Sequence, residues 1–414
     1  MKEQYHQKED RDELLLRLDR REVERLVNAE LHRSALGVGA MVIAEMLKDE
    51  VESICGSARK RSSKRKGHRY GKQGGYVVLG GQKVRIERPR VRSLDGKDEI
   101  ELTIYRRLQQ LDAIDEGVMR RLIRGVSCRS YAGVVETICQ SVGLSRSSVS
   151  RAFVRKAEEK VKAFFARRFD AVRFLAIFID GVQFKGQTMM VAIGVTDDGT
   201  KRVLSVRQGA TENARVCIDL LEELRERGIS TERPTLFVLD GSKALHAAVE
   251  RVWGEQAQVQ RCRLHKIRNL RAYVPDRLWP SVLKDVREAY AQPTYSRAKK
   301  RLEIIARWLD RVAPAAAHSL REGLDETLTI TKLNLPAKLA RGLVTTNLIE
   351  SPFERIRSIT RRIPRWSGEM RLRWCVTALL EAEGRFIRIS GASHIDKLAA
   401  ALDRHRHQKE EMIA

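Results

Sequence analysis

The chain has 414 residues, of which 43% are hydrophobic, so it is long enough for two to four domains of ordinary size. No apolar run approaches the roughly 20 residues that a membrane-spanning helix needs. The first 26 residues are strongly charged and lack the apolar centre of a signal peptide. The sequence argues against a membrane protein, and we expect a soluble protein that is not exported.

Basic residues are in large excess: 79 Lys and Arg against 54 Asp and Glu give a formal net charge of +25. Internal ion pairs cannot neutralise that excess, so an external polyanion is the natural partner. Nucleic acid is the first candidate, through contacts with its phosphates. An acidic membrane surface is the alternative, but no strongly hydrophobic amphipathic stretch accompanies the charge. A solvated basic surface without a partner is the third interpretation.

The cysteines contain no C-x-x-C pair, so they predict neither a disulfide framework nor a zinc ribbon. Reduced thiols of a cytosolic protein fit their wide spacing better. The six are Cys55, Cys128, Cys139, Cys217, Cys262 and Cys375.

The first 110 residues are expected to form a helical segment and a basic hairpin that bind DNA. Residues 1 to about 56 have apolar positions at three-to-four spacing, which is typical of helices. Residues 57–75 carry eight Lys or Arg and no acid, which alone would indicate a solvated linker. Residues 76–93 alternate apolar and basic residues around two glycines, which predicts a hairpin. Together they predict a phosphate-binding surface that displays Lys83, Arg85, Arg88, Arg90 and Arg92.

Residues 111–168 read as three successive helices. The second is expected to end at Gly143 and the third to begin after Ser145, a plausible N-cap residue. Two helices joined by a short turn containing glycine are typical of a helix-turn-helix. In that motif the start of the second helix faces the bases, so it would present Arg146, Ser147, Ser150 and Arg151. An ordinary helical hairpin fits the pattern nearly as well, and the net charge favours DNA binding.

From residue 171 the hydrophobic period switches to two. Strands are predicted over 172–181, 187–196, 201–210, 234–241 and 257–265, with helices over 213–229 and 242–254. Three strands followed by alternating helices and strands predict an α/β core with a mixed sheet. Beyond His265 the chain reads as helical to about residue 344, after which arginine-rich amphipathic helices follow. The tail from about residue 391 reads as frayed and polar.

Two of the predicted strands end in an acid followed by glycine, at Asp180 and Asp240. An Asp-Gly pair after one strand commonly marks only a turn. Parallel strands that end at the same edge of a sheet bring both carboxylates to the edge where open α/β folds bind ligands. Carboxylate oxygens suit Mg²⁺ or Mn²⁺. Two such ions about 4 Å apart activate a water and stabilise the leaving oxygen in phosphodiester cleavage.

A third acid is needed to complete such a site, and Glu350 is the best candidate. It lies beyond the helical stretch, where a helix would return to the sheet. Glu354 competes for the role, but Ser351-Pro352-Phe353-Glu354 reads as a capping box with proline at the first helical position. That gives Glu354 a structural task.

With these residues the chain resembles the Mutator-like transposases of bacterial insertion sequences, a DDE transposase family. The resemblance rests on "IDGV" around Asp180, "VLDGSKAL" around Asp240, "QRCRLHKIRN", and "TTNLIE" with Arg357 downstream. The segment "HRYGKQGGYVVLGGQKVRIERPRVRS" also resembles the part that precedes the family's catalytic core. The likeness extends from about residue 30 to 390.

The resemblance implies a ribonuclease-H-like catalytic core with an Asp-Asp-Glu triad and an all-helical insertion before the Glu. Asp180, Asp240 and Glu350 would then be the catalytic ligands of two Mg²⁺ or Mn²⁺ ions. Cys262 and His265 match the family's Cys-x-x-His signature and are expected to shape the active site or position DNA. Two residues cannot form a closed zinc site. A buried cysteine beside a hydrogen-bonded histidine is an equally good interpretation.

Many relatives carry an Asn shortly after the Glu, whereas this chain has "ESPFERIR". The arginines of the following helix are expected to contact DNA, unless they form only a solvated face: Arg355, Arg357, Arg361 and Arg362. The expected domains are the N-terminal segment and hairpin (1–110), the helix-turn-helix (111–168), the core in two parts (169–265 and 345–392), the helical insertion (266–344) and a polar tail (393–414).

We therefore expect a DNA transposase that binds the terminal inverted repeats of its insertion sequence and performs metal-dependent cleavage and strand transfer. Joining two ends requires a homodimer or a larger assembly on DNA. The protein is expected in the bacterial cytoplasm, associated with the nucleoid. A nuclease without strand transfer and a non-catalytic DNA-binding regulator are the alternatives.

Overall fold

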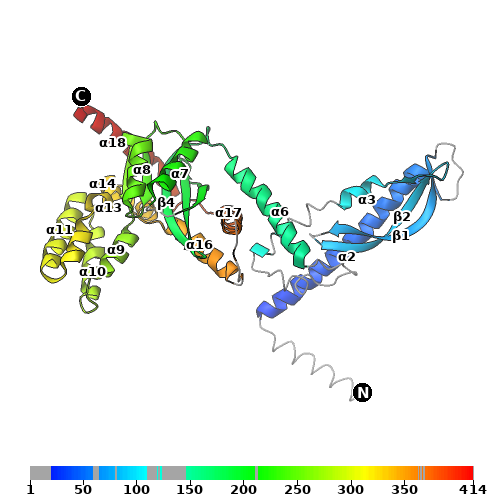
Figure 1. The fold of residues 1–414 in the computed structure, drawn as a ribbon, viewed down its shortest axis with the longest axis horizontal. Helices are drawn as coiled ribbons and strands as arrows, with labels where there is room; N and C mark the ends of the chain where they lie inside the picture. The colour runs from blue at the N-terminus through cyan, green and yellow to red at the C-terminus, as the bar shows by residue number, and fades with distance from the viewer. Residues whose placement is uncertain are drawn as a thin grey trace, which may run out of the picture. The chain divides into compact units, whose positions relative to one another are not determined.

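The computed structural model describes residues 20–58, 65–79, 82–109, 119, 122–123, 146–209, 213–361, 363, 366 and 369–413 (Figure 1). The chain divides into two compact units, Met1–Lys156 and Ala157–Ala414. Within the described residues, no helix is long and apolar enough to span a bilayer. The described cysteines, Cys55, Cys217, Cys262 and Cys375, are buried, and none of these four forms a disulfide.

The first unit packs a long helix against a hairpin. Its elements are α2 (Arg20–Cys55), β1 (Gly67–Leu79), β2 (Gln82–Ser93), β3 (Glu99–Ile100) and α3 (Thr103–Leu108). Ile43, Leu47 and Val51 recur every four residues on α2 and meet Val77 and Val84 of the hairpin in a common core. The predicted helix and hairpin are both present. However, β1 begins at Gly67, so it takes up much of the segment interpreted as a linker.

The predicted helix-turn-helix falls largely outside the described residues, which include only 119, 122 and 123 between 110 and 145. Its third helix is present as α6 (Arg146–Phe165).

The second unit is built on a mixed five-stranded sheet in the order β6-β5-β4-β7-β8. The strands are β4 (Phe174–Phe184), β5 (Gln187–Thr196), β6 (Lys201–Gln208), β7 (Thr235–Leu239) and β8 (Ala257–Arg261). Strand β4 pairs antiparallel with β5 and parallel with β7, and β7 pairs parallel with β8. This confirms the predicted α/β core with a mixed sheet. The central strand reads as one apolar run because both of its faces are covered.

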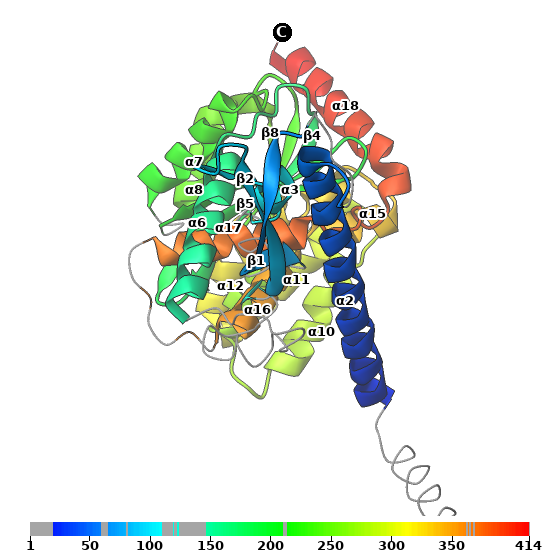
Figure 2. The same cartoon turned by 90° about the vertical axis from the view of Figure 1, so that its right-hand side faces the viewer.

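Helices cover each face of this sheet (Figure 2). Ile177 and Ile179 of β4 join a core with α7 (Ala214–Glu226) and α8 (Lys243–Trp253). The alternate residues Phe178 and Val182 join the opposite core, to which α16 (Asn347–Thr360), α17 (Met370–Glu383) and α18 (Ile395–Ile413) contribute. The side of β4 on which a residue lies therefore decides which helices it meets.

The helical stretch predicted beyond His265 is present, and this helical insertion has a core of its own, formed by residues such as Val286, Leu302 and Leu309. It appears in Figure 1 as the yellow-green block beside the sheet. Its helices are α9 (Arg263–Arg271), α10 (Trp279–Tyr290), α11 (Tyr295–Val312), α12 (Pro314–Arg321), α13 (Leu324–Thr327), α14 (Thr329–Lys332) and α15 (Ala337–Leu343).

Two predicted strand ends are wrong. Strand β4 does not end at Asp180-Gly181 but continues to Phe184, and the turn lies at Lys185-Gly186, where both residues have positive φ. Such a pair is typical of a two-residue hairpin. Strand β8 ends at Arg261 rather than at 265, so His265 lies on helix α9.

Two predictions near the C-terminus are also wrong. Helix α16 begins at Asn347, which places Pro352 inside the helix rather than at its first position. The expected capping box therefore does not start this helix. The tail is not frayed from residue 391, because the start of α18 buries Ile395 and Leu398 in the core on the α16 side of the sheet.

A candidate metal centre where parallel strand pairing ends

Asp180 and Asp240 follow equivalent positions on two neighbouring parallel strands. The pairing of β4 with β7 ends at Ile179 and Leu239, and each acid is the next residue in the chain, Asp180 still within β4 and Asp240 just after β7. Asp180 is 3% exposed. The alternation that sends Phe178 and Val182 to the α16 side sends Asp180 to the same side. The predicted edge therefore exists, although β4 itself continues past it.

Helix α16 brings Glu350 to this edge in its first turn. Asp180, His265 and Glu350 can each place one ligand atom so that all three atoms lie within 4.8 Å of one another. Asp240 does not belong to this group; its Oδ1 accepts a hydrogen bond of 3.0 Å from the amide of Ser242. The structure therefore gathers two predicted ligands and one predicted supporting residue, with Asp240 beside them.

Burial and like charges make the site unfavourable for an isolated carboxylate. Burial raises the pKa of Asp180 to about 6, and the charges of Asp240 and Glu350 add to the rise. The charge of His265 and a hydrogen bond from Thr346 oppose it. A hydrogen bond to Cys262 raises the pKa of His265 to about 9, against the effect of burial. At neutral pH an imidazolium therefore faces these acids.

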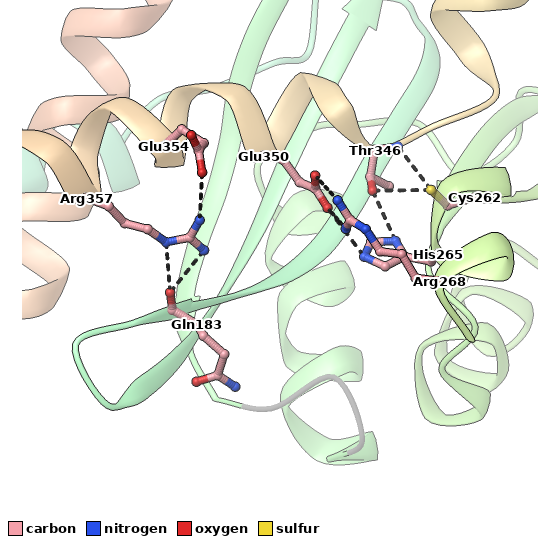
Figure 3. A network of polar contacts seen from close by, with 8 residues as sticks. All are labelled: Gln183, Cys262, His265, Arg268, Thr346, Glu350, Glu354 and Arg357. Carbon is pink, nitrogen blue, oxygen red and sulfur yellow. Dashed lines mark hydrogen bonds and ion pairs between the residues drawn. The ribbon is translucent and has the colours of Figure 1, made fainter. Parts of the chain in front are cut away.

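Arg268 is the main partner of Glu350, and the sequence analysis missed it. Its Nη1 donates to Oε1 at 2.5 Å and its Nη2 donates to Oε2 at 3.1 Å (Figure 3). The hydrogen bond to Arg268 holds the pKa of Glu350 below its usual range, against the effect of burial. His265 Nε2 lies 3.5 Å from the same Oε1. Arg268 and His265 are three residues apart on α9 and so share a face. A helix assignment for "RCRLHKIRN" would have revealed this pair.

Cys262 connects the start of α9 to the start of α16. Its Sγ accepts hydrogen bonds from the amide of Thr346 at 3.4 Å and from the hydroxyl of Thr346 at 3.6 Å (Figure 3). Its own amide donates to the carbonyl of Leu239 at 2.7 Å, and the amide of Arg263 donates to Val344 at 3.0 Å. Both Cys262 and Thr346 are fully buried. The Cys-x-x-His segment thus fixes the helix that carries Glu350 relative to strand β7.

The other residues predicted around Glu350 lie apart from the carboxylate group. The side chain of Glu354 is 81% exposed and contacts Arg357 at 4.0 Å. The guanidinium of Arg357 donates to the carbonyl of Gln183 at 3.2 Å, in the hairpin that joins β4 to β5 (Figure 3). Of the two competing glutamates, only Glu350 lies with Asp180. Arg355 and Arg361 are exposed on or just after α16.

The predicted DNA-contact residues belong to several elements of the two units. In the first unit, Lys83 lies over the ring of Tyr76 at 4.1 Å and Arg88 lies over Tyr105 at 4.9 Å, while Arg85 is exposed. Those of the predicted recognition helix belong to α6, where Ser150 and Arg151 are exposed and Arg146 and Ser147 form its first turn.

The chain is similar to known transposases over most of its length. A family model described as "Transposase, Mutator family" matches residues 8–387. The transposase for insertion sequence element ISRM5 of Rhizobium meliloti (strain 1021) is 29% identical over 332 residues, covering 77% of this chain and 80% of the relative. The transposase for IS6120 of Mycolicibacterium smegmatis is 28% identical, covering 58% of this chain and 74% of the relative. The transposase for IST2 of Acidithiobacillus ferrooxidans is 30% identical, covering 42% of this chain and 57% of the relative. The chain therefore belongs to the Mutator family of transposases.

Proposed function

We propose that this transposase is of the DDE type and that Asp180, Asp240 and Glu350 are its catalytic triad, in a ribonuclease-H-like core. The observation that carries the proposal is the convergence of Asp180 and Glu350, which lie 170 residues apart in the sequence. The sheet supports the core assignment, because three antiparallel strands are followed by two parallel ones, with β4 in the centre. The proposed core comprises residues 169–265 and 345–392.

The residues of the site fit divalent cations. Two carboxylates converge and a third lies beside them, so that their mutual repulsion contributes to the raised pKa of Asp180. Oxygen donors of this kind suit Mg²⁺ or Mn²⁺. When bound, two such ions would supply activation of a water and charge stabilisation for the leaving oxygen of a phosphodiester.

The chain's own groups hold the acids in place. The pairing of Asp180 with Val191 of β5 fixes the backbone of Asp180 within β4, and the contacts of Cys262 with Thr346 fix the first turn of α16. Arg268 orients the carboxylate of Glu350 by two hydrogen bonds and, with His265, balances its charge. Phosphoryl transfer of this class depends on positioning and electrostatics, and no side chain has to form a covalent intermediate.

The proposed substrate is DNA: the terminal inverted repeats of the element and a target duplex. The excess of basic residues supports sequence-independent phosphate contacts. We assign such contacts to the hairpin residues Lys83, Arg85 and Arg88, to the start of α6 and to Arg355 and Arg361 of the α16 region. Two ends have to be joined in one complex, so the proposal includes a dimer or larger assembly on DNA, in a cytoplasmic, nucleoid-associated protein.

The test uses the full chain with Asp180→Asn, Glu350→Gln and, as a matched control, Glu354→Gln. Labelled duplexes that carry the element's own end are incubated with Mg²⁺, and cleavage is followed on sequencing gels. We expect the first two variants to lose at least about 100-fold in rate, while Glu354→Gln cleaves like the native chain.

Two further measurements accompany the cleavage assay. Gel-shift binding should survive in Asp180→Asn, because the substitution removes chemistry and not phosphate contacts. A pre-cut end with a 3′-hydroxyl should be joined to a second duplex by the native chain. Native-like cleavage by Asp180→Asn would overturn the triad, and cleavage without joining would indicate a nuclease.

A further inference from the structure

The unit Ala157–Ala414 carries a basic surface on the side of α16 away from Asp180. It is a groove of about 810 Å³ between α15, the first turns of α16 and the segment 385–393 that follows α17. None of the described residues that line it is acidic. Its cations are Lys201, Lys338, Arg341, Arg385 and Arg388.

Most of this positive charge is not neutralised within the described part of the chain. Lys338 and Arg341 are exposed on α15, and neither forms an ion pair with any described residue. Arg385 pairs with Glu381 at 2.5 Å, and Arg388 lies 3.8 Å from Asp198. Lys201, the fifth cation, lies over the ring of Phe386 at 5.4 Å. Five cations thus face the groove against two carboxylates, which leaves a surplus for an external anion.

The groove also offers groups that suit a nucleic acid strand. Ser351, Ser390 and Ser393 line it and provide hydroxyl donors for phosphate oxygens. Ile387 is 80% exposed at its side, next to Phe386, and provides an apolar contact for sugars or bases. The groove, at about 810 Å³, is much larger than a single phosphate, and five cations line it. Its size favours a polyanion over a small anion.

The groove shares helix α16 with the acidic centre. Asn347 and Ser351 line the groove, whereas Glu350, between them in sequence, faces Asp180 and Arg268. The two sites are therefore about one helix diameter apart, on the order of 10 Å. Since B-DNA rises 3.4 Å per base pair, about three base pairs span that distance. A duplex whose scissile phosphate lies at the acids can reach the groove with nearby phosphates.

We propose that this groove, lined by Lys338 and Arg341, binds the phosphate backbone of the DNA that flanks the cleaved bond. The inference rests on the proposed function, because it takes DNA as the substrate. The contacts are sequence-independent, so both the element's end and target DNA are possible sources of the phosphates.

The test compares two double variants of the full chain that each remove two exposed cations, three residues apart, from one helix. Lys338→Gln/Arg341→Gln changes the groove. Arg297→Gln/Lys300→Gln on α11 is the control, since both residues are exposed and form no ion pair with described residues. Fluorescence anisotropy with a 40-base-pair duplex, in EDTA, measures affinity at salt concentrations from 50 to 200 mM. One duplex carries the element's end and a second has random sequence. Circular dichroism checks that both variants remain folded.

The groove variant should bind more weakly, and the slope of log affinity against log salt should fall by about 2, since each lost phosphate contact removes about 0.9. The control should keep the native slope. A loss with both duplexes supports general backbone contact, and a loss with the element's end alone supports the proposal with that end as the source. Native slopes with both duplexes would overturn it.

Chemical protection gives a second readout on the native chain, without any substitution. Acetylation of lysines, read by mass spectrometry, should slow several-fold at Lys338 when duplex is present and stay unchanged at Lys300. Equal reactivity of Lys338 with and without duplex would contradict the proposal, and so would protection by an acidic polypeptide but not by DNA. These measurements need no metal, so their failure would contradict DNA binding by the groove without affecting the proposed triad. Cleavage by Asp180→Asn would contradict the proposed triad whatever the groove binds.

Discussion

Gln260 connects the five-stranded sheet to the helical insertion, and its replacement by leucine should lower the stability of the fold. The side chain is fully buried on β8. Its Nε2 donates to the carbonyl of Arg261 at 2.7 Å and to that of Thr327 at 3.0 Å. Its Oε1 accepts a hydrogen bond of 2.9 Å from the amide of Ile330, in the first turn of α14. Leucine has nearly the same volume and can make none of these bonds.

The magnitude follows from which groups lose their partners. The carbonyl of Thr327 keeps a hydrogen bond of 2.9 Å from Nε of Arg263. The amide of Ile330 is in the first turn of its helix, where no intrahelical acceptor exists. The amide of Ile330, left as an unsatisfied buried donor, costs about 1–3 kcal/mol, and the lost bond to the carbonyl of Arg261 costs about 1 kcal/mol. Gln260→Leu should therefore lower the free energy of unfolding by about 2–4 kcal/mol.

The assay is urea unfolding of the full chain followed by tryptophan fluorescence. All five tryptophans lie in the unit Ala157–Ala414, so the signal reports on that unit alone. Gln258→Leu is the matched control: it lies on the same face of the same strand, is 9% exposed, and makes no side-chain hydrogen bond within the described residues. The control should cost less than about 1 kcal/mol. Equal losses in the two variants would refute the reasoning.

Two other substitutions have matched neighbours. Thr346→Val removes a buried hydroxyl that contacts Cys262 and should cost about 1–2 kcal/mol in the same assay, more than Thr345→Val, whose hydroxyl makes no hydrogen bond within the described residues. The hydroxyl of Thr196 and the amide and hydroxyl of Thr200 donate hydrogen bonds to Asp198 and lower its pKa to about 2. The ionised carboxylate therefore stabilises the fold above about pH 4, and this stabilisation disappears as the pH falls toward 2. Relative to Asp197→Asn, Asp198→Asn should be destabilised by about 1 kcal/mol or less at pH 6, because the group is largely exposed, and the difference should shrink below pH 4. A pH-independent difference would contradict that assignment.

Local patterns were enough to predict the strands of the sheet and the helical stretch that follows them. The apolar run before Asp180 predicted a central strand because a strand covered on both faces needs no polar alternation. The turn after Asp180 was a wrong prediction, since Asp-Gly fits a turn but also fits an extended strand. The real turn uses Lys185 and Gly186, and a lysine with positive φ has no clear sequence signal. The acid is nevertheless at an edge, because its parallel neighbour β7 ends one residue earlier.

The partners of Glu350 were beyond local patterns. Arg268 is 82 residues away, and its role depends on whether "RCRLH" is strand or helix. The alternation of apolar and polar residues through β8 favoured a strand to residue 265, but the pairing with β7 stops at Arg261. Because α9 begins at Arg263, His265 and Arg268 lie on the same face of one helix, whereas the sequence prediction placed His265 at the end of a strand. Long-range packing, rather than propensity, decides where α9 begins.

The contacts at the two ends of the helical insertion explain how about 80 residues can interrupt the proposed catalytic core without displacing Glu350 from Asp180. The chain leaves the sheet at Cys262 and returns at Thr346, and these two residues contact each other. Arg263 with Val344 and Arg268 with Glu350 bridge the same junction. The insertion therefore begins and ends at one point, and the loop between adds only a small closure cost as it lengthens. Its content can vary while the first turn of α16 stays fixed, so residues at the junction, and not those in the insertion's core, should control the position of Glu350.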